Sequence, residues 1–222
     1  MEWTGFAAIF AAFFLTHSIP VRPAVKSRLV RSIGTRCFGL AYSALSIGML
    51  ALLIWSAGEA PHVQLWPQAE WHRHAAHLGM LVVCLLLALS IGQPNPFSFG
   101  GAQNDCFDAS RPGIVRWTRH PVLLALAIWA GVHLLPNGDL AHVILFGVLG
   151  SFALAGRALI DRRKRRLLGV SRWMALDSTR KAAPPFHAPY SWPNLFCRYL
   201  IGLAAFAALL LAHPYVIGVS AL

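Results

Sequence analysis

The chain has 222 residues, of which 57% are hydrophobic and 12% are charged. Soluble domains carry about 25% charged residues, so this composition excludes both a disordered chain and an ordinary soluble enzyme. The excess of 19 Lys and Arg over 8 Asp and Glu gives a net charge of +11. We attribute this excess to orientation in a bilayer, and we expect no nucleic-acid partner. The length leaves room for one transmembrane domain, residues 1–222, without a sizeable soluble domain.

The apolar residues form six blocks near the length of about 20 residues that crosses a bilayer. These blocks cover approximately Trp3–Pro20, Cys37–Ala57, Ala75–Gly92, Arg119–Pro136, Leu140–Ile160 and Leu195–Ile217. They predict an all-α fold, a polytopic membrane helix bundle of about six transmembrane helices. The first block resembles a signal peptide but carries Glu2 in place of a basic start and lacks a small-residue cleavage site, so we interpret it as a retained span.

The connecting loops predict the orientation. Basic residues gather in the first, third and fifth loops, whereas the second carries Glu59 and Glu70. The rule that positive loops stay inside therefore places the odd loops in the cytoplasm and both termini outside. The fifth loop combines a basic run with Pro184-Pro185, and we expect a flexible segment that anchors at lipid headgroups.

The fourth loop predicts a helical hairpin. It is little more than Asn137-Gly138-Asp139. Asn-Gly is typical of a tight turn, and Asp139 can cap the helix that follows. We therefore expect the fourth and fifth spans to pack antiparallel.

Neither the cysteines nor the familiar catalytic motifs indicate a site. Cys37, Cys84, Cys106 and Cys197 are scattered without metal-ligand spacing, and Cys84 lies in an apolar run as a small core residue would. The chain has no G-x-S-x-G, Walker or H-E-x-x-H motif.

The 10 histidines carry more information. Ionisable side chains are costly in lipid and usually face a bundle interior, a cavity or a cofactor. Neutral imidazole is also the commonest side-chain ligand of haem iron and other metals. His17 ends the first span, where it could bind iron or bond a neighbouring helix. His133 lies among small residues near the far end of the fourth span, and these would let a planar ligand or a helix approach closely.

Other histidines have simpler interpretations. His120 begins the fourth span beside Arg119, where both could anchor at headgroups or bind a phosphate or a cofactor carboxylate. His74 and His77 share a helical face, which favours an interfacial position over a metal pair. His142 is interpreted as interfacial, and His62, His187 and His213 receive no role.

Several short motifs occur in a specific order along these spans. They are Phe14-Leu-Thr-His17-Ser, Arg28-Leu-Val-Arg, Pro94-Asn-Pro-Phe97, Thr118-Arg-His-Pro121, Trp129 to His133-Leu-Leu-Pro-Asn-Gly-Asp139, and Asp161-Arg-Arg. With these motifs the chain resembles the NnrU family of membrane proteins over nearly its whole length. The resemblance implies an association with nitrite and nitric oxide reduction in denitrifying bacteria.

The same resemblance implies a cofactor. Plant and algal relatives are zeta-carotene isomerases that hold haem b with histidines, and their ligand positions correspond to His17 and His133. The cysteine that these relatives carry three residues before the second histidine is Ala130 here. The predicted topology, however, places His17 and His133 near opposite faces, since 13 residues of helix from His120 to His133 span roughly 20 Å. Depth alone would pair His17 with His120, or His133 with His77, and these remain alternate cofactor-binding residues.

The sequence therefore supports several functions. The first is a haem b protein of nitrogen-oxide respiration with a respiratory redox partner. The second is a haem-dependent cis–trans isomerase of a hydrophobic, carotenoid-like polyene. The Arg119-His-Pro121 segment also resembles the cofactor motif of membrane methyltransferases, although Leu123 replaces their tyrosine. A non-catalytic scaffold would need no cofactor.

Overall fold

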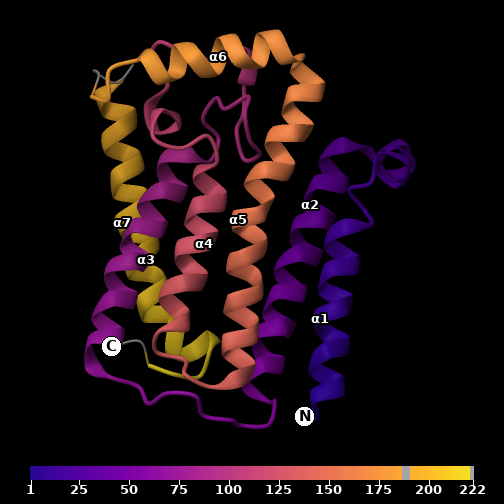
Figure 1. Cartoon of the computed structure of the whole chain (residues 1–222), viewed down its shortest axis with the longest axis vertical. Coiled ribbons are helices and arrows are strands. Elements are labelled where there is room, and N and C mark those ends of the chain that lie inside the picture. The colour runs from indigo at the N-terminus through magenta and orange to yellow at the C-terminus, as the bar shows by residue number, and fades with distance from the viewer. Residues whose placement is uncertain (187–190, 221–222) are drawn as a thin grey trace. The chain divides into compact units, whose positions relative to one another are not determined.

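The computed structural model describes residues 1–186 and 191–220, and in this part of the chain every regular element is helical (Figure 1). The α-helices are α1 (Trp3–Ser18), α2 (Pro23–Gly58), α3 (Glu70–Ser90), α4 (Pro121–Leu134), α5 (Leu140–Leu168), α6 (Val170–Ala182) and α7 (Trp192–Val216). Short 3-10 turns cover Asn104–Cys106 and Gly113–Arg116. The predicted all-α fold is confirmed, and each of the six apolar blocks corresponds to one helix.

Length and composition identify a membrane protein. In the described residues α2, α3, α5 and α7 are long and apolar enough to cross a bilayer, whereas α1 and α4 are apolar helices of 16 and 14 residues. Large apolar side chains remain exposed on the long helices, such as Leu40 on α2 at 73% and Leu78 on α3 at 67%. Such side chains suit a lipid environment better than water.

Most of the predicted fifth loop is helical. The basic run after Ile160 continues α5 to Leu168, and α6 follows directly after Gly169, whose φ is +81°. The prediction of a flexible fifth loop is therefore wrong as far as Ala182. Its Arg, Lys and Leu residues have high helix propensity, and no proline interrupts them. Of the predicted loop, residues 187–190 lie outside the described residues.

The first basic loop is helical as well. Pro23 occupies the first turn of α2, where its missing N–H costs nothing. Gly34 interrupts the helix with φ +79° and ψ 159°, a conformation that favours glycine. The apolar block predicted from Cys37 thus corresponds to the part of α2 that follows this break.

The chain divides into two compact units. The first comprises Met1–Pro67 and Gly138–Leu145, in which α1 packs on α2. The second comprises Gln68–Asn137 and the chain from Phe146 onward, in which α3 packs against both α4 and α7. Within the second unit α6 runs across the end of the helices, with α3 and α4 beneath it (Figure 1).

The structure confirms the predicted hairpin. The Asp139 carboxylate accepts a hydrogen bond from the backbone N–H of His142 at 3.2 Å and so caps α5. Within the second unit, Gly150 faces Ala130 and Gly156 faces Leu123, so α4 and α5 run antiparallel. Cys84 is 3% exposed and belongs to the core, as expected.

The turn requires glycine at position 138 because the backbone of Trp66 lies very close to it in the first unit. The Gly138 carbonyl accepts hydrogen bonds from the backbone N–H groups of Leu65 (2.7 Å) and Trp66 (3.1 Å). A Cβ at position 138 would collide with the backbone oxygen and the indole of Trp66. This contact joins the segment before α3 to the start of α5.

The substitution Gly138→Ala should therefore lower the stability of the protein. Overpacking of this kind costs about 1–3 kcal/mol, which thermal unfolding in detergent can measure. The matched control is Gly147→Ala on α5, where an added Cβ meets nothing within 4 Å. An unchanged melting temperature for Gly138→Ala would contradict the close approach.

Candidate functional site

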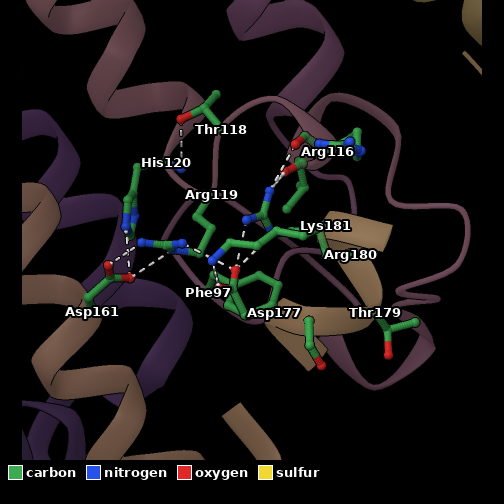
Figure 2. Close-up of polar contacts among 12 residues, drawn as sticks. Phe97, Arg116, Thr118, Arg119, His120, Asp161, Asp177, Thr179, Arg180 and Lys181 are labelled. Atoms are coloured by element: carbon green, nitrogen blue, oxygen red, sulfur yellow. Dashed lines mark hydrogen bonds and ion pairs between the residues drawn. The ribbon is translucent and has the colours of Figure 1, made fainter. Parts of the chain in front are cut away.

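Arg119 lies at the centre of a polar cluster in the second unit (Figure 2). Its guanidinium makes a bidentate contact with Asp161 of α5, with Nη2 at 2.7 Å from Oδ2 and Nε at 3.2 Å from Oδ1. Nη1 also donates to Oδ1 of Asp177 on α6 at 3.1 Å. One side chain from the segment before α4 thus joins two further helices. The planar fork of arginine suits this role because it can donate to two carboxylates at once.

His120 is enclosed in the same cluster, with 1% of its surface exposed. Nε2 contacts Asp161 Oδ1 at 3.0 Å, and Nδ1 contacts Ser98 Oγ at 3.0 Å. Burial lowers the pKa of His120, and the Asp161 carboxylate opposes this shift without cancelling it. A carboxylate accepts, so Nε2–H donates to Asp161 and the Ser98 hydroxyl donates to Nδ1. Both ring nitrogens are therefore engaged.

Helix α6 is attached to this cluster by charge. Asp177 accepts from Arg180 Nε at 2.9 Å and pairs with Lys181 Nζ at 2.9 Å. Arg180 Nη1 also donates to the carbonyl groups of Val115 (3.0 Å) and Arg116 (2.8 Å). The buried side of α6 thus carries an ion pair as well as the apolar Trp173.

The Pro94-Asn-Pro-Phe97 motif forms the next part of the cluster. Asn95 donates from Nδ2 to the Arg119 carbonyl at 3.0 Å and accepts from the Phe97 N–H at 3.0 Å. Phe97 is fully buried and packs edge-on against Trp173. The guanidinium carbons of Arg165 and Arg119 lie 4.1 and 5.1 Å from the Trp173 ring centroid, within the range of cation–π attraction.

The sequence analysis did not foresee this cluster. It placed Arg119 and His120 at the headgroup level and gave no role to Asn95, Ser98, Asp177 or Arg180. One signal was present, since Asp161 and Asp177 are two of only 8 acidic residues and both lie in or beside a strongly basic stretch. An isolated acid among arginines is a candidate partner for one of them.

His17 has a different environment, in the first unit. Its Nδ1 lies 2.9 Å from the Phe13 carbonyl, four residues earlier on α1. A carbonyl can only accept, so Nδ1 carries a proton and donates to it. The ring packs against Phe13 with centroids 4.0 Å apart, and Tyr42 of α2 lies 6.2 Å away.

His133 repeats this arrangement in the second unit. Its Nδ1 lies 2.8 Å from the Trp129 carbonyl, again four residues earlier in the helix. The rings of Trp129 and Phe146 lie 5.4 and 5.3 Å from it. Within the described residues, Nε2 forms no hydrogen bond in either His17 or His133.

The structure brings some of the predicted histidines together and leaves others apart. His120 and His133 lie at opposite ends of α4, about 20 Å apart along the helix. His77 lies on α3, and Gly79 two residues later packs against Val132, so His77 and His133 have a similar level in the second unit. His17 belongs to the first unit, and its pairing with His133 stays a prediction. No group of three or more His, Cys, Asp or Glu that could hold a metal ion occurs in the described ranges.

These observations define an all-helical membrane protein with a partly buried cluster of arginine, aspartate and histidine side chains at one end of its second unit. The family model described as NnrU protein matches residues 5–221. The chain therefore belongs to the NnrU family. The comparisons with curated proteins and with solved structures find no match.

The substitution Asp161→Asn should destabilise the protein because it leaves Arg119 without its bidentate partner. Removing one member of a buried ion pair costs about 3–5 kcal/mol. Because the Arg119 and Asp161 side chains retain 23% and 15% exposure, we expect about 2 kcal/mol, within the range for charged hydrogen bonds. The exposed Glu59→Gln is the control. Equal melting temperatures for the two variants would show that the cluster does not hold the helices together.

The Asp177 carboxylate should make the stability of the protein depend on pH. Burial raises its pKa, but hydrogen bonds from Lys181 and Arg180 and the charge of Arg119 outweigh burial and leave the pKa lowered. Because the pKa of Asp177 is lower in the folded protein, its carboxylate stabilises the fold at pH values above the unfolded-state pKa of about 3.9. This stabilisation is lost as the pH falls through the folded-state pKa. The melting-temperature difference between the native protein and Asp177→Asn should therefore shrink below about pH 4. A difference that is constant from pH 7 to pH 3 would refute this.

Proposed function

We propose that this protein binds haem b through Nε2 of His17 and His133 and serves the reduction of nitrite and nitric oxide. The observation that carries the proposal is the hydrogen bond from Nδ1 of each ring to the carbonyl four residues earlier. Histidines that bind metals almost always donate their other ring N–H to a carbonyl or carboxylate. Both rings are oriented in this way.

The surroundings of both rings also fit a porphyrin. Phe13 and Tyr42 lie beside His17, and Trp129 and Phe146 lie beside His133. Aromatic side chains can pack against the faces of a planar macrocycle and exclude water. When bound, haem supplies one-electron chemistry at iron, while the chain supplies ligands, orientation and an apolar surrounding.

The alternate ligands are less favoured by their contacts. A ligand role for His120 would require the loss of its hydrogen bond to Asp161 or of its hydrogen bond to Ser98, and the stabilisation from that bond would be lost. His77 is a stronger alternate, because its level on α3 matches that of His133. The proposal includes an inner-membrane location with both termini outside, and a respiratory partner that delivers electrons.

The test measures oxidised and dithionite-reduced spectra of the detergent-purified protein expressed with sufficient haem. The native protein should contain haem b in a low-spin, six-coordinate state. His17→Ala and His133→Ala should each lose haem or become high-spin, and added imidazole should restore the low-spin spectrum by occupying the vacant ligand position. The exposed His62→Gln is the control, with an unchanged spectrum expected.

Three outcomes would overturn this assignment. A colourless native protein would remove haem from the account. Full haem and an unchanged spectrum in His133→Ala would remove that ligand, and loss in His77→Ala with none in His17→Ala would transfer the second position to α3. The respiratory role is tested by nitric oxide consumption in a denitrifying host that lacks the protein, where the native gene should restore consumption and His133→Ala should not.

A further inference from the structure

A small cavity lies in the second unit, where the chain before α4 meets the junction of α5 and α6. It has a volume of about 170 Å³. Phe107, Leu168 and Leu176 form part of its apolar wall, and Lys164, Arg172 and Asp105 bring charge to it. The polar cluster around Arg119 does not line this cavity, so the two are separate features of the second unit.

The cations of this cavity differ from those of the cluster in their partners. Arg119 and Arg180 are both paired with carboxylates. Lys164 is half-buried, yet neither it nor Arg172 forms an ion pair within the described part of the chain. A partly desolvated ammonium without an ion-pair partner is costly, and a bound anion would offset that cost.

The size of the cavity limits its ligand. Sites for drug-sized molecules have volumes of about 300–1,000 Å³, so this cavity is too small for haem or for a polyene. A phosphate ester of a small polyol is of suitable size. Exposed apolar residues lie on the same junction, with Leu167 at 69%, Val170 at 59% and Met174 at 58% exposure. These side chains could contact acyl chains while the cavity holds a headgroup.

We infer that this cavity binds the phosphate of a glycerol phosphate group through Lys164 and Arg172. The group could belong to phosphatidylglycerol or to free glycerol phosphate, because both present the same anionic phosphate. Basic pockets beside transmembrane helices commonly bind such headgroups. The inference does not depend on haem, and the haem content of each variant below should equal that of the native protein.

The experiment counts ligands bound to the detergent-purified full chain by native mass spectrometry. The probes are phosphatidylglycerol, phosphatidylcholine and glycerol 3-phosphate. The double variant Lys164→Gln/Arg172→Gln should bind phosphatidylglycerol about 30-fold more weakly than the native protein, since two basic residues are lost. The matched control Arg162→Gln/Arg166→Gln removes two exposed arginines that do not line the cavity, and its affinity should stay within about twofold, since exposed charges are screened by salt.

Loss of binding in the double variant could also result from misfolding, so a second variant is chosen that should bind more tightly than the native protein. Asp105 is the carboxylate on this cavity, and Asp105→Asn should strengthen phosphate binding about fivefold by removing a like charge. If phosphatidylglycerol binding depends on the cavity residues and glycerol 3-phosphate does not displace the lipid, the site belongs to the lipid. Displacement at low concentration assigns it to the soluble ester. Equal losses in the cavity and control variants, or equal affinity for phosphatidylcholine, would overturn the inference.

Discussion

Polar groups withdrawn from water must find partners inside the protein, and this constraint organises one end of the second unit. Only 12% of the residues are charged, so the available partners are few. The partly buried guanidinium of Arg119 forms ion pairs with Asp161 and Asp177, which belong to two different helices. His120 does so between Asp161 and Ser98. Because these partners are far apart in the sequence, satisfying one guanidinium also fixes α5 and α6 against the chain before α4.

The same constraint distinguishes the histidines from one another. His120 uses both ring nitrogens within the cluster, and its role is therefore one of holding neighbouring side chains in place. His17 and His133 satisfy Nδ1 within their own helices and direct Nε2 elsewhere. A histidine with one nitrogen fixed by a carbonyl and the other carrying its lone pair is prepared to bind a metal. The contrast favours His17 and His133 over His120 as ligands.

Much of the fold could be predicted from the sequence, because apolar blocks and turn residues act locally. The hairpin of α4 and α5 follows from Asn137-Gly138 and the capping Asp139. The helical extension of α5 could not be predicted from hydropathy, which does not separate a solvated basic helix from a loop. The cluster could not be predicted either, because spacing in the sequence does not show that Asp177 lies beside Arg119, which is 58 positions earlier. The pairing of His17 with His133 stays a prediction, because they belong to separate units.

The central proposal is that His17 and His133 would hold haem b, and replacing a ligand tests it more directly than removing one. The measurement is near-infrared magnetic circular dichroism of the oxidised, haem-loaded protein at low temperature. The native protein should give the charge-transfer band of bis-histidine low-spin iron. His17→Met and His133→Met should each shift this band to the position of histidine–methionine ligation. A native spectrum of high-spin iron, or a band that neither substitution shifts, would contradict the account.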